Sequence, residues 1–153
     1  SFLTGITGLR VQDLKKCTFT LPTSVASLDM DYDTKRVTFS GTENLTHLDI
    51  PSDSIRTSPC PKLQELRWFC IDHAAEALPL PVRDLTTLSK PEIFMRTIGP
   101  RFLFPPQLTS LKLVVCNGPV NSAILTPLTG LEDLFIESSA TTKTHSTCRD
   151  SQR

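Results

Sequence analysis

The chain has no excess charge of either sign, because its 16 basic and 16 acidic residues give a formal net charge of zero over 153 residues. A surface that attracts nucleic acid or an anionic membrane normally carries a clear basic excess. The sequence also has no apolar run near the roughly 18 residues that a transmembrane helix needs. We therefore expect neither a nucleic-acid partner nor a membrane partner.

Motifs for catalysis, for metal binding and for phosphate binding are missing as well. The five cysteines form no CxxC pair and no Cys–His cluster at metal-ligand spacing, and the six glycines are scattered singly. The nearest useful pair of a cysteine and a histidine in sequence is Cys70 and His73, and it has no orienting third group or oxyanion feature. The sequence thus predicts a protein with no enzymatic activity, no cofactor and no metal.

Cysteine usage and the N-terminus bear on the cellular compartment. Irregularly spaced cysteines are typical of reduced, buried thiols in a cytoplasmic protein. The first residues also lack the basic region and apolar run of a secretory signal. The tripeptide Asn44-Leu-Thr46 is a glycosylation sequon, which matters only in a secretory compartment. We expect a cytoplasmic protein, and keep a secreted or cell-surface location as the alternative.

What the sequence does contain is a six-residue pattern, apolar-x-x-Leu-x-apolar, that returns about every twenty residues. The copies begin at Ile6, Val25, Leu45, Leu63, Leu85, Leu108 and Leu131. The copy at Leu85 is the weakest, because Lys90 takes its last apolar position. A strand with a return segment cannot bury its apolar face alone, so neighbouring repeats must stack. The pattern predicts a solenoid of about seven repeats.

The segments that join the copies are predicted to be mostly irregular, with two short helices. Asp72–Leu78 begins with an N-cap residue and ends before a proline, and Pro91–Ile98 has a proline in its first turn and a glycine after its end. Within each copy the alternation of apolar residues indicates a short strand, and strands that all run the same way must pair in parallel. Isolated apolar residues of the return segments are expected to turn inward: Leu21, Val37, Phe39, Ile55, Val120 and Ile124.

The apolar period stops after Glu137. Residues 138–153 are rich in Ser and Thr, with one Ala and one Cys as their only apolar members. Such a segment cannot bury enough surface to order itself. We predict one repeat domain over residues 1–137 and a disordered polar tail over 138–153. Because the chain has no initiating Met and opens within a repeat, we interpret it as a fragment of a longer protein.

The repeats resemble the leucine-rich repeat family through their LxxLxL core. Clear examples are Leu63-x-x-Leu66-x-Trp68 and Leu108-x-x-Leu111-x-Leu113-x-x-Cys116, and the resemblance covers roughly residues 3–137. The Asn that commonly follows the strand in this family is missing throughout. The resemblance implies an α/β solenoid with parallel strands on a concave face and irregular or short-helix crossovers. It also implies binding of partners, commonly proteins, on that concave face.

On such a face, the residues on either side of each central Leu point outward, because alternate side chains of a strand leave opposite faces. The column after the central Leu then reads Arg10, Asp29, Asp49, Arg67, Ser89, Lys112 and Phe135. Exposed aromatic and arginine side chains are common anchors of protein interfaces. Three of these outward residues, Asp29, Asp31 and Asp49, form an acidic patch, which lies beside a stripe of basic and aromatic residues. We predict that the following residues bind the partner: Asp29, Asp31, His47, Asp49, Arg67, Phe69, Lys112 and Phe135.

These observations predict non-enzymatic protein recognition through a concave repeat face. Two alternatives keep the same scaffold: the substrate-recognition region of a larger protein of the ubiquitin-ligase type, and a secreted or surface recognition module. A third alternative, a hydrolase that uses Cys70, would require thiol-dependent turnover.

Overall fold

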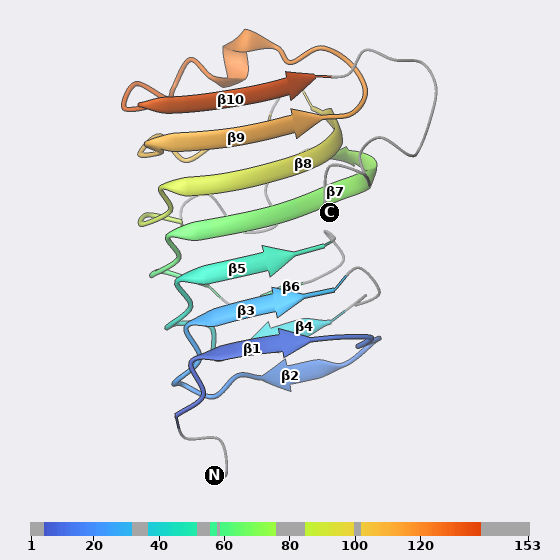
Figure 1. Cartoon of the computed structure of the whole chain (residues 1–153), viewed down its shortest axis with the longest axis vertical. Helices are drawn as coiled ribbons and strands as arrows, with labels where there is room; N and C mark the ends of the chain where they lie inside the picture. Colours follow the sequence, from blue (N-terminus) through green and yellow to red (C-terminus); the bar gives the residue numbers. More distant parts are fainter. Residues whose placement is uncertain are drawn as a thin grey trace.

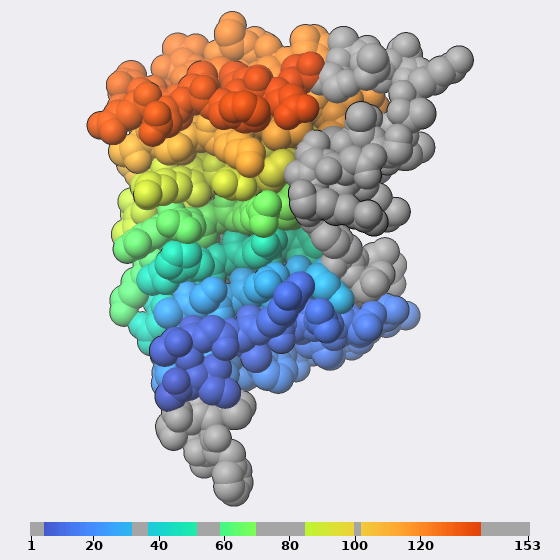
Figure 2. Space-filling model, in the orientation of Figure 1, coloured from blue at the N-terminus to red at the C-terminus, as the bar shows by residue number. Residues whose placement is uncertain are grey.

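The computed structural model describes residues 5–31, 37–51, 56–57, 59–75, 85–99 and 102–138, and of 56–57 and 70–75 it describes the backbone. Within these ranges the chain winds as a solenoid of parallel strands, whose repeats follow one another as successive bands (Figures 1 and 2). A seven-stranded sheet has the order β1-β3-β5-β7-β8-β9-β10. Its strands are β1 Gly8–Val11, β3 Ser27–Met30, β5 His47–Ile50, β7 Glu65–Ala75, β8 Lys90–Ile98, β9 Ser110–Val115 and β10 Asp133–Ser138.

The strands pair so that equivalent residues of successive repeats lie side by side. Leu28 is paired with Leu9 on one side and with Leu48 on the other, and Leu111 is paired with Leu134. We call this column the central residues; they are Leu9, Leu28, Leu48, Leu66, Pro91, Leu111 and Leu134. The expected solenoid with parallel strands is therefore confirmed.

A tight turn precedes each strand of this sheet from β3 onward. The N–H of Leu45 donates to the carbonyl of Thr42 at 3.1 Å, and the N–H of Leu63 donates to that of Cys60 at the same distance. The next turn repeats this geometry from Leu88 to Leu85, at 3.2 Å. Leu88, not Leu85, thus takes the first position of its repeat.

The register predicted for the repeat of β8 was wrong. Leu66 pairs with Pro91 and Trp68 pairs with Ile93, so a proline occupies the central position and Ile93 fills the apolar position that seemed lost. Proline has no N–H for the ladder. In agreement, pairing between β8 and β9 starts after the proline, at Glu92 with Lys112. With its first position at Leu88, this repeat begins later in the sequence than the pattern indicated. Its spacing in residues from the preceding repeat is therefore longer, and its spacing to the following repeat is shorter.

The α/β prediction, with its two helical crossovers, was wrong where the structure describes them. Residues 72–75 continue strand β7, and residues 91–98 lie in β8; residues 76–78 are outside the described ranges. Pairing between neighbouring repeats overrides the helix propensity of these segments. Within the described residues the helical element is the short 3-10 helix η2, Ser122–Ile124, whose N-cap Asn121 side chain accepts the N–H of Ala123.

Behind the first repeats lies a second parallel sheet of three short strands (Figure 1). Its strands are β2 Thr18–Thr20, β4 Thr38–Ser40 and β6 Arg56–Thr57. Phe19 is paired with Phe39 in this sheet, and the N–H of Leu21 donates to the carbonyl of Ser40 at 2.9 Å. The solenoid is thus closed at the back by backbone pairing in this half.

The core runs between the two sides of the solenoid as one continuous apolar cluster. Trp68, Phe39 and Phe102 are the largest of its fully buried side chains. The N–H of the Trp68 indole is buried without a hydrogen-bond partner. Of the return-segment residues expected to turn inward, Leu21, Val37, Phe39 and Ile124 are buried and Val120 packs partly buried against the cluster, whereas Ile55 lies outside the described residues.

Polar side chains join the turns of successive repeats. The Asn44 amide donates to the carbonyl of Thr23 at 2.9 Å and its oxygen accepts from Lys62 at 2.7 Å. The hydroxyl of Thr46 donates to the carbonyl of Ala26 at 3.1 Å. Both polar residues of the sequon therefore link neighbouring repeats.

The structure also bears on the expected thiols, membrane segments and tail. Cys17 and Cys60 are reduced thiols, and Cys60 is buried, but Cys116 is disulfide-bonded, so the expectation of reduced thiols fails there. Among the described residues, no helix has the length and apolar character that crossing a bilayer would require. Strand β10 includes Ser138, and the rest of the predicted tail, residues 139–153, lies outside the described residues.

Candidate functional site

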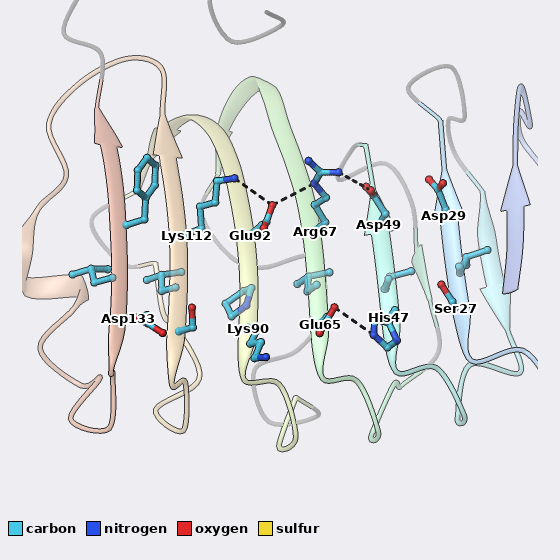
Figure 3. A pocket seen from close by; sticks show the side chains of 18 residues that line it. Ser27, Asp29, His47, Asp49, Glu65, Arg67, Lys90, Glu92, Lys112 and Asp133 are labelled. Atoms are coloured by element: carbon cyan, nitrogen blue, oxygen red, sulfur yellow. Dashed lines mark ion pairs between the residues drawn. The ribbon is translucent and has the colours of Figure 1, made fainter. Parts of the chain in front are cut away.

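A groove of about 1110 Å³ runs over the outer face of the seven-stranded sheet, from Ser27–Asp29 on β3 to Asp133–Phe135 on β10. We call this surface the groove face. From β3 to β10 its lining includes the central residue of each strand and the residues immediately before and after it, and the side chains of these two neighbours point away from the core. Figure 3 shows the two resulting rows of polar side chains, which cross the strands from one repeat to the next.

The row after the central residues is a ladder of charges, which we call the charge ladder: Arg10, Asp29, Asp49, Arg67, Glu92 and Lys112. Arg67 lies between two carboxylates, with its Nη1 3.8 Å from Asp49 Oδ2 and its Nε 3.4 Å from Glu92 Oε2. Lys112 Nζ is 3.6 Å from the same Glu92 oxygen, and Arg10 Nε is 3.5 Å from Asp29 Oδ2. The dashed lines of Figure 3 follow this chain of contacts from Lys112 to Asp49.

The alternation of charge fails at one point of the ladder, where Asp29 and Asp49 are paired neighbours on β3 and β5. Burial raises the pKa of Asp49 to about 6, Arg67 opposes this shift, and the negative charges of Asp29 and Glu92 add to it. A carboxyl whose pKa is near 6 gains a proton under mildly acidic conditions and can then donate a hydrogen bond. Asp49 is therefore the chemically most perturbed group described on this face.

The row before the central residues begins with Ser27 and His47 and ends with Asp133. His47 Nε2 is 3.3 Å from Glu65 Oε2, and its Nδ1 shares a hydrogen bond of 2.8 Å with the Thr46 hydroxyl. The side chains of His47 and Glu65 are both 50% exposed, so a molecule in the groove can reach them.

The two aromatic residues expected on this face differ completely in exposure. Phe135 is 52% exposed and lines the groove, whereas Phe69 is only 2% exposed. Phe69 stacks on Phe94 of the next strand, with ring centroids 4.5 Å apart, and forms a small cluster with it and Val114. Arg67 and Lys112 cover these rings: the Arg67 guanidinium carbon is 5.3 Å from the Phe69 centroid and Lys112 Nζ is 5.3 Å from the Phe94 centroid. The expectation of an exposed Phe69 was therefore wrong.

The structure brings six of the eight expected residues together along the groove: Asp29, His47, Asp49, Arg67, Lys112 and Phe135. Asp31 follows β3 outside the groove, and its Oδ1 accepts the N–H of Asp13 at 3.2 Å. Sequence reasoning missed Lys90 and Glu92, because the register error placed Thr87 and Ser89 at their positions. The missed signal was Leu88-x-x-Pro91-x-Ile93, the repeat pattern with proline in place of the central Leu.

Among the residues that the structure describes, no three His, Cys, Asp or Glu side chains gather closely enough to hold a metal ion. Comparison with known proteins adds no relative: no protein-family model, no curated protein and no solved structure matches the chain. The functional argument therefore depends on the groove and its side chains.

Proposed function

We propose that this chain is a non-enzymatic recognition module of the leucine-rich repeat type, which binds a segment of another protein along the groove face. The observation that carries the proposal is the continuity of the groove, which crosses the strands from β3 to β10. Both of its rows present charged or polar side chains in register. A protein segment laid across the strands would contact several repeats at once.

The size and chemistry of the groove favour a protein over other ligands. Its volume of about 1110 Å³ is at the upper limit of the roughly 300–1,000 Å³ that is common for small-molecule pockets, and its lining extends across the strands from β3 to β10. The charge ladder has three basic and three acidic members, so it lacks the positive excess on which nucleic-acid binding depends. Phe135 adds an exposed aromatic anchor at one end of the groove.

The ion pairs of the ladder are well suited to exchange with a partner. Arg67, Glu92 and Lys112 have side chains 40–48% exposed, so each pair contributes only about 0–1 kcal/mol to the fold. A partner carboxylate or cation can therefore replace an internal one at small cost. Charged side chains arranged in this way determine mainly which partner binds and how fast.

Site-specific photo-crosslinking tests the proposal. A photoreactive amino acid is placed at Ser110, which lines the groove, or at Thr18, which is exposed on β2 behind the solenoid. With lysate as the source of partners, we expect a discrete crosslinked protein from Ser110 and none from Thr18. The same adduct from both positions, or from Thr18 alone, would place any partner elsewhere and contradict the proposal.

A charge reversal provides the second arm of this experiment. Arg67→Glu introduces a third acid between Asp49 and Glu92, which should weaken the Ser110 adduct by about tenfold or more if the partner contacts the ladder. Lys62→Glu is the matched control, since Lys62 is an exposed cation at a turn outside the groove. An adduct insensitive to Arg67→Glu but lost with Lys62→Glu would move the site to the turns.

A further inference from the structure

The charges that line the groove are distributed unevenly along its length (Figure 3). At one end, on β3 and β5, the lining has two acids, Asp29 and Asp49, and no lysine or arginine. On β8 and β9 it has two bases, Lys90 and Lys112, and the single acid Glu92. Between these parts β7 contributes one acid and one base, and β10 adds an acid at the far end. Because the chain as a whole is neutral, this difference is a local property of the groove.

The two acids at the first end lie side by side between two arginines. Asp29 and Asp49 are paired in the register of β3 and β5, so their negative charges repel each other. On β1, Arg10 Nε is 3.5 Å from Asp29 Oδ2. On β7, Arg67 Nη1 is 3.8 Å from Asp49 Oδ2, but Arg67 Nε is closer to Glu92 Oε2, at 3.4 Å. The space above the two aspartates therefore favours a further positive charge.

Lys90 is the complementary feature in the other part of the groove. Its side chain is exposed and forms no ion pair with any residue that the structure describes. Glu65 is its neighbour in the register, but Glu65 Oε2 is 3.3 Å from His47 Nε2 instead. Strand β8 thus offers a positive charge to an acid of a ligand in the groove.

We infer that the segment bound in the groove carries a base over β3 and β5 and an acid about four residues away over β8. This inference rests on the proposed function, and it specifies the chemistry and the direction of the segment. A lysine or arginine of the segment would contact Asp29 and Asp49, and a glutamate or aspartate would contact Lys90. Neighbouring strands are about 4.8 Å apart, so the midpoint of β3 and β5 is about 12 Å from β8, which an extended chain covers in about four residues.

Charge complementarity decides between this segment and others. A segment of the opposite order would bring its acid to Asp29 and Asp49 and its base to Lys90, so both ends would be repelled. A uniformly basic segment would gain at the first end and lose at Lys90, and a uniformly acidic segment would do the reverse. A segment with one base and one acid in the stated order gains at both ends.

Two synthetic peptides of equal composition test the inference. The ordered probe is Lys-Lys-Ser-Ser-Glu-Glu and the scrambled probe is Lys-Glu-Ser-Lys-Glu-Ser, both with capped termini and a fluorescent label. Binding is followed by fluorescence anisotropy in low salt at pH 7.5, above the pKa of Asp49 of about 6, so that this carboxyl is ionised. We expect the ordered probe to bind at least about fivefold more tightly than the scrambled probe, and high salt to remove the difference.

Charge reversal at each end identifies the contacts. Asp49→Lys and Lys90→Glu should each weaken binding of the ordered probe by about tenfold. Glu43→Lys is the matched control for the first variant, because Glu43 is an exposed acid at a turn outside the groove lining. Circular dichroism and the melting temperature establish that each variant folds, and Asp29→Lys replaces Asp49→Lys if that variant does not. Equal weakening by Glu43→Lys would mean nonspecific attraction and would overturn the inference.

Crosslinking determines the direction of the segment. A photoreactive amino acid is placed at Ser27 on β3 or at Ser110 on β9, and both positions line the groove. Mass spectrometry of the adducts with the ordered probe should locate the Ser27 adduct on its lysines and the Ser110 adduct on its glutamates. The opposite assignment, or no binding of the ordered probe up to about 5 mM, overturns the inference.

The proposed function is tested separately, by the protein captured from lysate at Ser110. A captured segment with an acid at the Ser110 contact and a base at the Ser27 contact supports the inference. If a protein is captured but its segment has another order of charge, the groove binds a protein in a different way and only the inference fails. If Ser110 captures no protein, the proposed function fails, and the inference fails with it.

Discussion

The two halves of the solenoid close their backs in different ways. In the first half, the repeats that begin at Ile6, Val25, Leu45 and Leu63 follow at nearly equal intervals, and the strands β2, β4 and β6 pair behind the main sheet. In the second half, the repeats that begin at Leu88, Leu108 and Leu131 follow at longer or less even intervals. The described back of that half contains the 3-10 helix η2 and packed side chains in place of a sheet.

This difference shows what a regular repeat length provides. Backbone pairing at the back requires that equivalent residues return to the same height in each turn, which nearly equal intervals allow. Where the intervals vary, side chains must fill the space between the two sides of the solenoid. The Phe102 ring does so: its centroid is 5.0 Å from that of Phe104 and 6.3 Å from that of Trp68. The first half should therefore be sensitive to backbone geometry and the second half to side-chain truncation.

The largest effect is expected where a charge enters the shared core. Leu66→Asp puts a carboxylate at a central residue that is 1% exposed, and should cost about 5 kcal/mol or more, enough to unfold a domain of ordinary stability. Leu134→Asp is the matched control, because the same column is 49% exposed there and the cost should be about 1 kcal/mol or less. Urea unfolding followed by circular dichroism measures both. Equal losses would contradict the different burial of these two central residues.

Truncation of an aromatic residue tests the side-chain dependence of the second half. Phe102→Ala removes a ring that is 1% exposed, and should lower the free energy of unfolding by about 3–5 kcal/mol. Phe19→Ala in the first half removes a ring that is 36% exposed, so its loss should be about 1 kcal/mol. If chemical denaturation shows the same loss for the two variants, the different burial of the two rings does not determine the cost.

A backbone substitution tests the first half. Gly41 follows β4 with φ of 73°, and a Cβ there would lie 2.6 Å from the carbonyl oxygen of Leu21. Gly41→Ala should therefore cost about 1–3 kcal/mol, because both the conformation and the contact are strained. Gly8→Ala, with no atom within 4 Å of its Cβ, should change stability by about 0.5 kcal/mol or less. Thermal unfolding of the two variants gives the comparison, and a tolerant Gly41 would argue against a rigid back sheet.

On the groove face, the raised pKa of Asp49 should make the free energy of unfolding depend on pH. The expected change is similar to or smaller than that of Gly41→Ala. The folded-state pKa of about 6 is above the ordinary value of 3.8, so the folded chain binds the proton more tightly and loses stability as the pH rises from about 4 to about 6. Asp49→Asn should remove this loss. Because solvent screens a side chain that is 28% exposed, the gain at pH 7.5 should be about 1–2 kcal/mol, with little difference at pH 4. Urea unfolding at the two pH values checks this, and a gain that is equal at both would exclude titration of Asp49 as its cause.

Much of the main sheet could be predicted from the sequence, because most strands repeat the same alternation around a central Leu. Six of the eight expected groove residues followed from that alternation alone. The β8 repeat could not be placed in this way. Leu85-x-x-Leu88 matches the start of the pattern, whereas the true central position is occupied by Pro91 instead of Leu. This one shift in register concealed Lys90, Glu92 and Phe94, and with Phe94 the burial of Phe69.

The back of the solenoid and the longer strands were harder to predict for a different physical reason. Segments such as Pro91–Ile98 have helix-forming residues, and only pairing between repeats, which depends on distant sequence, makes them strands. The second sheet has strands of two or three residues, too short for a periodic signal.

The smallest effect on stability is expected at the centre of the charge ladder. Arg67→Gln removes two partly exposed ion pairs, to Asp49 and Glu92, and should cost about 0.5 kcal/mol. Its effect on titration should be clearer, since Arg67 is the main group that lowers the pKa of Asp49. In the variant that pKa should rise above 6, which NMR titration of the Asp49 carboxyl carbon can follow. Lys112→Gln is the control, because Lys112 contacts Glu92 and is not among the groups that shift Asp49. An unchanged Asp49 titration in Arg67→Gln would show that Arg67 and Asp49 are not electrostatically coupled between β7 and β5, and that the ladder does not act as one electrostatic unit.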